Sequence, residues 1–360
     1  MNASFERRLA AAVQLNCDIA DARHAADLTL CIYLLQMREL FRWERGLPFG
    51  AALGRDEIAT WIAEREARWD ALETRSFVRV PSFPGDAATD GIDPFDAEAV
   101  NATLRPLGLL YGAGLVGAGR PVFFVGELHD RQCRDGLEVL AAGRELARGL
   151  VAPPAALAGE GRGPIVLRRE SLARWCWEKV EAASLRPQAD GPLQALFAEH
   201  RLDCDFDAAL PGWLDEAVEM LVLHELGEHR AGCRLGPDWG AMRLALGGRR
   251  AELYTRALRD HLADLEVTLP TLLDRGSTAA LHFWFANLDG VRELLFPGLA
   301  PAYAQWRGGD AGAALRRAIA TGLAHFRALS DEVLALHRGA GAPAAAIETL
   351  LTSPRAVCRC

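Results

Sequence analysis

The sequence has 360 residues, half of them hydrophobic, and a formal net charge of −8. This length predicts one large domain or two to three ordinary ones, and the negative charge argues against nucleic acid or an anionic membrane as the main partner. No apolar run reaches the ~20 residues that span a bilayer, and the first residues lack the apolar core of a secretory signal. We therefore expect a cytoplasmic protein whose eight cysteines, none in a CxxC pair, stay reduced.

Lysine is almost absent, since Lys179 is the only one. A nucleotide-binding P-loop needs a Gly-Lys-Ser/Thr triplet, which this sequence does not contain. The glycine-rich loop and catalytic triplets of protein kinases are missing as well, and Schiff-base chemistry could use only Lys179. The sequence therefore indicates no nucleotide cofactor.

Residues 1–75 are predicted to form a helical N-terminal part. Residues 3–45 read as a hairpin of helices buried through a dense series of apolar side chains: Leu28, Leu30, Ile32, Leu34, Leu35, Leu40 and Phe41. Gly46-Leu47-Pro48 ends that hairpin. A shorter helix follows, with apolar residues at helical spacing: Ile58, Trp61, Ile62, Trp69 and Leu72.

Residues 76–168 are predicted to form a small mixed α/β part. The alternation in SFVRVPSF predicts a strand that stops at Pro84-Gly85. The segment PVFFVGELHDRQCRDGLEVLAAG predicts a β-hairpin that turns at Asp135-Gly136. The segment PIVLRRE predicts another strand, which leads directly into a helix.

A glycine-rich segment precedes the hairpin, and it matches the GxGxxG pattern through Gly112, Gly114 and Gly117. A dinucleotide site needs this pattern to open a long helix. Gly119 and Pro121 stop such a helix at once, so we expect a flexible loop here instead.

The chain from residue 169 onward is predicted to be a helical bundle over residues 169–340, followed by a flexible tail over residues 341–360. The fold class expected from these three parts is mainly α (α+β), with a helical N-terminal part, a small mixed α/β segment and a C-terminal helical bundle.

The segment VLHELGEHRAG, residues 222–232, places four ionisable residues within six positions of the bundle. Its Glu225 and Glu228 continue an apolar stripe with steps of four and three, and His224 and His229 flank that stripe. The back of the helix is apolar too, through Met220, Leu223 and Leu226. We therefore predict that these four groups are largely buried.

Buried ionisable groups need partners, because an unpaired carboxylate in the core is costly or becomes protonated. His224 with Glu228, and Glu225 with His229, stand four apart and could pair with each other. A metal ion is the other solution, because imidazole and carboxylate together suit iron, manganese or zinc. The HExxH pattern of zinc proteases and the Glu-x-x-His of di-iron bundles are both absent.

A helix predicted over residues 249–270 supplies further candidates. Asp260 and Asp264 stand four apart, opposite a stripe of leucines. If both faces are buried, the two aspartates are metal ligands or arginine partners; if only the leucine face is buried, they are solvated. His261 is expected to be a core histidine, whereas His282 in the next helix is expected on a solvated face.

Three stretches resemble an uncharacterised bacterial family that has a domain of unknown function: ELARGLVAPP, IVLRRESLARWCWEKVEA and LHELGEH. The resemblance extends over most of the chain. It implies no activity, so the function has to be argued from the residues.

Two hypotheses about function follow. In the first, the bundle of an enzyme holds a divalent transition metal, with iron or manganese favoured and zinc as the variant. The chemistry is then oxidation-reduction or metal-assisted hydrolysis of a small molecule. The expected ligands come from His224, Glu225, Glu228, Asp260 and Asp264. His229 is the expected catalytic residue, as a base or as a support for a ligand.

In the second hypothesis, the protein is a scaffold that binds a protein partner. The same cluster is then a buried ion-pair network, and it contains arginines instead of a metal. The candidates for these arginines are Arg230, Arg256 or Arg259.

Overall fold

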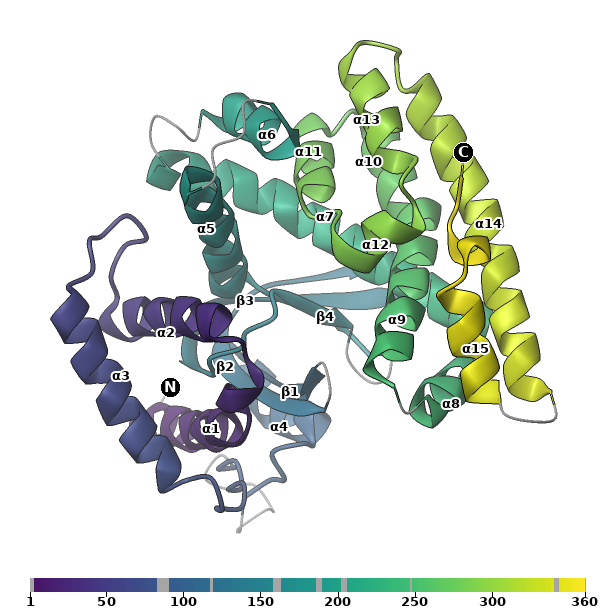
Figure 1. Ribbon diagram of the computed structural model, residues 1–360. Coiled ribbons are helices and arrows are strands. Elements are labelled where there is room, and N and C mark those ends of the chain that lie inside the picture. The colour runs from purple at the N-terminus through teal and green to yellow at the C-terminus, as the bar shows by residue number, and fades with distance from the viewer. Residues whose placement is uncertain are drawn as a thin grey trace. The chain divides into compact units, whose positions relative to one another are not determined.

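The computed structural model describes residues 3–82, 91–116, 119–157, 163–185, 190–201, 206–246, 248–339 and 343–359 (Figure 1). The chain forms two compact units. The first unit comprises Met1–Ala158 and Val166–Glu178, and the second comprises Gly159–Ile165 and Lys179–Cys360. The boundary thus falls within helix α5, Arg169–Leu185. The predicted boundary at about residue 75, between the helical N-terminal part and the mixed α/β part, stays a prediction.

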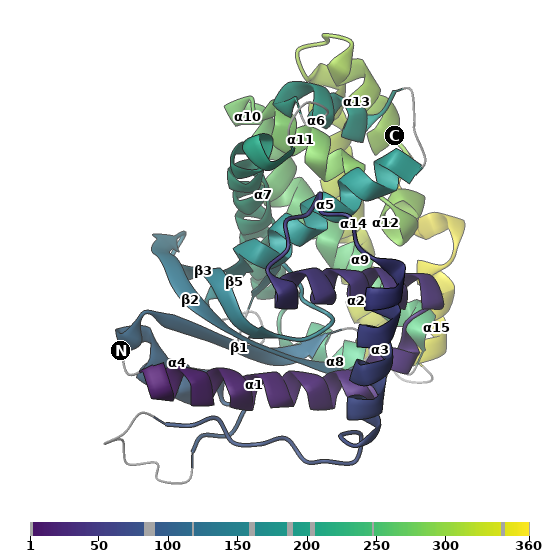
Figure 2. The same ribbon diagram turned by 90° about the vertical axis from the view of Figure 1, so that its left-hand side faces the viewer.

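A curled sheet is the centre of the first unit (Figure 2). Within the described residues it has five strands in the order β1-β2-β3-β5-β4, and β2 pairs antiparallel with both β1 and β3. Shifts of register near Gly126 interrupt the pairing of β2 with β3, and such bulges bend a strand. The strands are β1 Leu109–Val116, β2 Arg120–Arg134, β3 Leu137–Arg148, β4 Ala155–Leu157 and β5 Ile165–Arg168.

The predicted hairpin is confirmed, since β2 and β3 are joined by Asp135 and Gly136. Both turn residues have positive φ, 50° and 82°, as a tight two-residue hairpin turn requires. The strand predicted before α5 is also confirmed, because β5 ends at Arg168 and α5 begins at Arg169.

The loop predicted at the GxGxxG pattern is wrong, because Gly112 and Gly114 lie inside strand β1; Gly117 lies outside the described residues. A Cβ on Gly112 would stand 2.2 Å from the ring of Phe124 on β2. Gly112 therefore allows that ring to lie across β1, and the glycines mark close packing within the sheet.

The strand predicted in SFVRVPSF is wrong for residues 76–82, where only Val80 forms a bridge, to Ile92. Phe83 and the predicted stop at Pro84-Gly85 lie outside the described residues. The side chain of Asn16 takes the place of a partner strand at Val78. The backbone N–H of Val78 donates to Asn16 Oδ1 at 2.7 Å, and the carbonyl of Val78 accepts from Asn16 Nδ2 at 2.8 Å.

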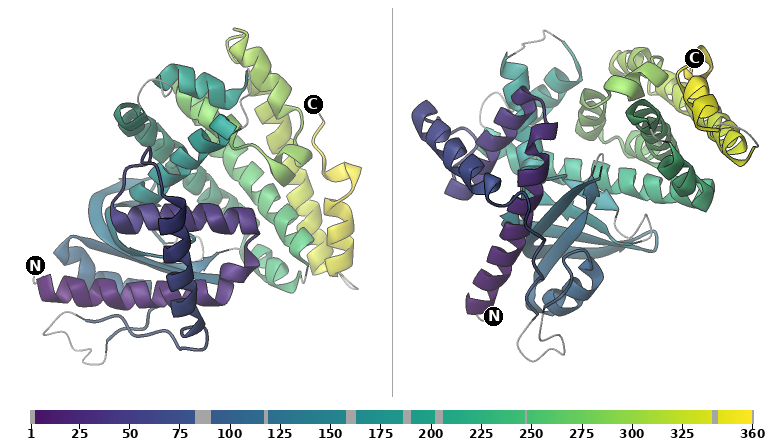
Figure 3. Two further views of the ribbon diagram at one scale, coloured as in Figure 1. Left: turned by 60° about the vertical axis from the view of Figure 1, so that its left-hand side comes forward. Right: turned by 60° about the horizontal axis from the view of Figure 1, so that its bottom comes forward.

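Helices cover the sheet of the first unit. The long helix α1 lies along it, as Figures 2 and 3 show, and buries an apolar stripe against β2 and β3. The buried helical hairpin predicted over residues 3–45 is only partly right, because Leu30, Ile32 and Leu34 are exposed, Leu30 by 70%. Its end at Gly46 is confirmed by a left-handed φ of 60°. The helices are α1 Ala3–His24, α2 Leu30–Arg45, α3 Arg55–Asp70 and α4 Ala97–Leu104.

From Lys179 onward, every element of the second unit within the described residues is a helix, so the mainly helical fold class is confirmed. No helix in the described part of the chain is long and apolar enough to cross a membrane. The helices are α6 Pro192–His200, α7 Phe206–Leu235, α8 Pro237–Ala245, α9 Arg249–Ala263, α10 Leu269–Arg275, α11 Thr278–Ala286, α12 Gly290–Leu295, α13 Leu299–Arg307, α14 Ala313–Arg338 and α15 Pro343–Leu351.

Helix α15 lies where the sequence predicted a flexible tail. It packs against α9 and α14 and buries Ile347 and Leu351. Beyond it, the backbone N–H of Cys358 donates to the carbonyl of Leu295 at 2.8 Å. Residues 343–359 therefore belong to the packed unit, because an apolar helix face and a backbone hydrogen bond hold them there.

Candidate functional site

Helices α7 and α9, both labelled in Figure 1, pack against each other in the second unit, and their backbones approach closely at Gly227. A Cβ on Gly227 would stand only 2.4 Å from the carbonyl oxygen of Ala263. The glycine in the segment HELGEH, residues 224–229, therefore allows the two backbones to come this close. This contact places His224 and Glu228 of α7 beside Asp260 of α9.

His224, Glu228 and Asp260 form a group that could hold a metal ion. Each offers one ligand atom, and these atoms all lie within 4.8 Å of one another. His224 Nε2 and Glu228 Oε1 are 4.0 Å apart. Two ligand atoms bound ~2.1 Å from one ion can be no farther apart than about 4.2 Å, so small side-chain movements would close the group around an ion.

The imidazole of His224 is oriented by a hydrogen bond between its Nδ1 and Asp264. His224 Nδ1 lies 2.8 Å from Asp264 Oδ1, which leaves Nε2 facing Glu228. Burial alone would lower the pKa of His224, but the Asp264 carboxylate outweighs it and raises the pKa to about 10. A carboxylate on the far nitrogen is the usual support of a histidine that binds metal through its other nitrogen.

Asp264 is buried at the start of a π-helical turn, Asp264–Thr268, that continues α9. Its second oxygen, Oδ2, accepts from Arg292 NH2 at 2.9 Å. Burial would raise the pKa of Asp264, but His224 and Arg292 outweigh it and hold the pKa well below its usual range. Insertions of this kind frequently occur at functional sites, and this one presents a charged carboxylate to the cluster.

The two remaining carboxyl groups differ in environment. Glu228 Oε2 accepts from Arg259 NH2 at 2.8 Å. Glu225 is only 7% exposed, and burial raises its pKa to about 7, an effect that His224 and Arg259 reduce and Glu228 and Asp260 reinforce. Burial also raises the pKa of Asp260.

The described part of this cluster contains more carboxylates than cations. Four carboxyl groups, from Glu225, Glu228, Asp260 and Asp264, share two guanidinium groups, from Arg259 and Arg292. If His224 gives up the proton on Nε2, as binding a metal through that nitrogen requires, and every carboxyl group is ionised, two negative charges are unbalanced. Bound protons or one divalent cation would neutralise them.

The predicted residues thus occupy different places. Three of them, His224, Glu228 and Asp260, form the group described above. Asp264 supports His224, and Glu225 interacts with the group through charge. His229 Nε2 lies 3.7 Å from Cys233 Sγ on α7, and its catalytic role stays a prediction.

Other histidine and arginine predictions are resolved by the packing. His261 is a core histidine as expected, since its ring stacks on Phe326 and Nε2 lies 2.9 Å from the carbonyl of Arg292. Of the three arginines expected in an ion-pair network, Arg259 contacts the cluster, whereas Arg230 and Arg256 are exposed. Arg292, which the sequence did not indicate, comes from α12.

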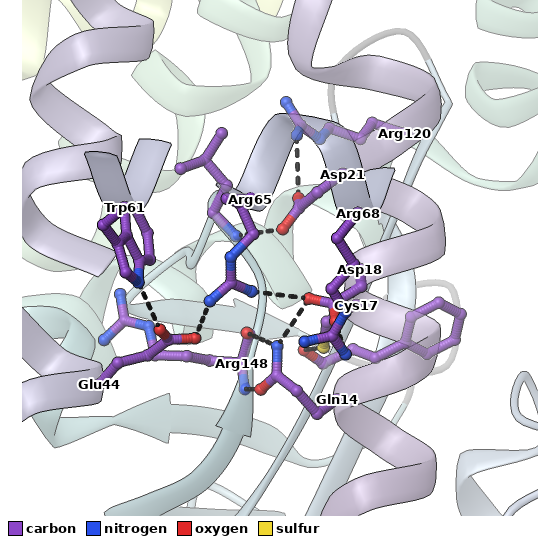
Figure 4. Close-up of polar contacts among 12 residues, drawn as sticks. Gln14, Cys17, Asp18, Asp21, Glu44, Trp61, Arg65, Arg68, Arg120 and Arg148 are labelled. Atoms are coloured by element: carbon purple, nitrogen blue, oxygen red, sulfur yellow. Dashed lines mark hydrogen bonds and ion pairs between the residues drawn. The ribbon is translucent and has the colours of Figure 1, made fainter. Parts of the chain in front are cut away.

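A second group of buried charges lies in the first unit, and the sequence analysis missed it (Figure 4). Asp18 of α1 is paired with Arg65 at 3.1 Å and with Arg68 at 2.6 Å. Asp21 accepts from Arg120 at 3.0 Å and from the backbone N–H of Leu150 at 2.7 Å. Burial raises the pKa of Asp21 to about 6 although Arg120 opposes this.

A spacing signal for this group was present in the sequence. Phe5, Leu9, Val13 and Cys17 follow one another in steps of four along the buried stripe of α1, and the next step reaches Asp21. The same reasoning that singled out Glu225 and Glu228 therefore applies to Asp21. Each carboxylate has an arginine partner, so this group ties α1 to α3 and β2 as a structural network.

Glu145 of β3 completes the charged interior of the first unit. It accepts from Arg168 Nε at 2.9 Å, from Arg168 NH2 at 2.8 Å and from the Ser171 hydroxyl at 2.8 Å. Burial would raise its pKa, but Arg168 and Arg148 lower it to about 2. This carboxylate therefore stays charged in the core because two guanidinium groups surround it.

Comparison with known proteins gives two matches, both to family models. Residues 8–168 match the model described as "Family of unknown function (DUF6866) N-terminal domain", and residues 173–354 match the corresponding C-terminal domain. No curated protein and no solved structure matches the chain. The resemblance noted in the sequence is thereby confirmed, and it brings no activity with it.

Proposed function

Since the chain belongs to the DUF6866 family of unknown function, its role has to come from its own residues, and we propose that it is a metal-dependent enzyme. The second unit holds one divalent transition metal between α7 and α9. The ligands are His224, Glu228 and Asp260. The observation that carries this proposal is the group of three ligand atoms within 4.8 Å of one another, whose histidine is already oriented by Asp264.

The donor set favours manganese or iron over zinc. One imidazole and two carboxylates are harder ligands than the His- and Cys-rich sets typical of zinc. A divalent ion would also neutralise the two unbalanced negative charges of the cluster. Asp264 acts as a support here, because its oxygens already contact His224 and Arg292.

Three protein ligands leave positions for water or substrate, which is the arrangement of a catalytic rather than a closed structural centre. Oxidation-reduction of a small molecule is the first proposed chemistry. Metal-assisted hydrolysis is the variant, in which the metal lowers the pKa of bound water. Glu225, which is buried directly beside the ligand His224 in the chain, is placed to accept a proton from that water. His229, on the next turn of α7, is proposed to assist this proton transfer.

A second proposal is the scaffold with a buried ion-pair network. It is supported by Arg259, which donates to Glu228 at 2.8 Å, and by Arg292, which donates to Asp264 at 2.9 Å. In that case protons on His224 and Glu225 balance the charge, and no metal is needed.

Elemental analysis after anaerobic loading with manganese or iron separates the two proposals. The metal proposal predicts about one equivalent of bound metal per chain. The double variant Glu228→Gln/Asp260→Asn should lose that metal, because it removes the charge of two of the three ligands, while circular dichroism shows that it remains folded.

Asp238→Asn is the matched control, because Asp238 forms an exposed ion pair with Arg338 on the same unit. This variant should keep the full metal content. A wild-type protein that is folded and metal-free after loading contradicts the metal proposal, and it favours the network if the double variant is also less stable.

A further inference from the structure

The second unit contains a cavity that is separate from the metal ligands. It has a volume of about 630 Å³ and is lined by residues of α5, α6, α11, α12 and α13, of which α6, α11 and α13 lie in the upper part of Figure 1. Sites for small molecules commonly measure ~300–1,000 Å³. The size of this cavity therefore suits a molecule of two or three rings.

One wall of the cavity is aromatic. The rings of Phe285 and Tyr303 stack with centroids 4.2 Å apart, and Leu193, Ala286 and Ala304 extend the apolar lining. His282, expected on a solvated face, is buried and its Nδ1 lies 2.7 Å from the Tyr303 hydroxyl. Because His282 occupies that hydroxyl, Tyr303 offers its ring rather than its polar group.

The polar residues of the lining favour an anion with a hydrogen-bond donor. Lys179 and Arg307 supply two positive charges, against one carboxylate from Glu293. Arg307 is paired with Asp190 at 2.8 Å, but Asp190 is 76% exposed, so this surface pair is weak. Gln194 Oε1 is buried and has no hydrogen-bond partner among the described residues, so a donor on the ligand would satisfy it.

We propose that this cavity binds a small organic anion with a flat apolar body. The body packs against the aromatic wall formed by Phe285 and Tyr303, the anionic group lies between Lys179 and Arg307, and a donor reaches Gln194. The inference stands apart from the metal proposal, since no lining residue belongs to the cluster at His224.

The probe for the test is anilinonaphthalene sulfonate, which has a flat body, one anionic group and one N–H. Its fluorescence in the presence of the full chain should rise and saturate. The Ala304→Trp variant should abolish this signal, because Ala304 lines the cavity and is itself exposed, so the new ring fills the cavity without disturbing the core. Ala320→Trp, at an exposed position of α14, should leave the signal unchanged.

The anionic requirement is tested with phenylnaphthylamine, the same body without the sulfonate. The Lys179→Gln and Arg307→Gln variants should each weaken binding of the sulfonate by about tenfold and leave the neutral dye nearly unaffected. Arg316→Gln, which removes an equal charge from an exposed pair with Asp274, should change neither.

Binding of the sulfonate that survives in folded Ala304→Trp overturns the proposal, since the dye then lies elsewhere, such as on the exposed leucines of α2. Absence of binding to the wild type overturns it as well. Equal response of both dyes to Lys179→Gln and Arg307→Gln overturns the anionic assignment.

Discussion

Replacing Gly227 with alanine is expected to destabilise the second unit by about 3 kcal/mol or more and to disperse the cluster at His224. The added Cβ would lie 2.4 Å from the carbonyl oxygen of Ala263 and 2.9 Å from its Cα. Both atoms belong to the backbone, so no side-chain rotation can relieve the overlap. Helices α7 and α9 have to move apart, and with them His224 and Asp260. Chemical denaturation and metal content measure the two effects.

Gly232→Ala is the control on the same helix. A Cβ at Gly232 meets nothing within 4 Å, and alanine is the better helix former, so this change should stabilise the protein by up to about 1 kcal/mol. If Gly227→Ala is as harmless as Gly232→Ala, the close approach of α7 and α9 is not what builds the cluster.

Replacing Glu145 with glutamine is expected to lower the free energy of unfolding of the first unit by about 3 kcal/mol or more. The change leaves the buried guanidinium groups of Arg168 and Arg148 without their carboxylate. Glu127→Gln is the control in the same sheet, because Glu127 and its partner Arg144 are both about half exposed. It should cost less than about 1 kcal/mol. Equal losses in the two variants would contradict the buried network.

The ionisation of Glu145 should also make the stability of the folded chain depend on pH. The pKa of Glu145 is lowered from 4.5 to about 2 in the folded chain, so the folded state binds this proton less readily than the unfolded state. The stabilisation is therefore complete above pH 4.5 and is lost as the pH falls toward 2, by about 3 kcal/mol in total. The free energy of unfolding, measured between pH 2 and pH 4.5, should change less with pH in Glu145→Gln than in the wild type. An identical pH dependence in the two proteins would contradict the role given to Glu145.

The sequence predicted those features that depend on local chemistry. The Asp135-Gly136 turn is specified by two adjacent residues that tolerate positive φ, and the burial of Glu225 follows from its place in the stripe of α7. The pairing of Asp260 and Asp264 with the HELGEH helix was likewise among the predicted alternatives. Each of these predictions depends on the spacing of residues within one element or on the regular spacing of apolar residues in two helices.

The missed features depend on contacts between distant segments. Arg292 contacts Asp264 from α12, 28 residues away, and no periodicity links the two. Gly112 lies in a strand because it pairs with Phe124 of the neighbouring strand, whose ring covers it, and composition alone does not reveal that pairing. Asp21 was detectable from the stripe of α1, but its partner Arg120 stands 99 residues farther along the chain.

The proposed metal site is tested most directly by locating the metal itself. A crystal of the manganese-loaded protein, measured on either side of the manganese absorption edge, locates the ion by its anomalous scattering. We predict one peak about 2.0–2.3 Å from His224 Nε2 and from one oxygen each of Glu228 and Asp260, with Asp264 still bonded to His224 Nδ1. A fully loaded crystal with no peak there, and with Arg259 and His224 alone facing the two carboxylates, would contradict it.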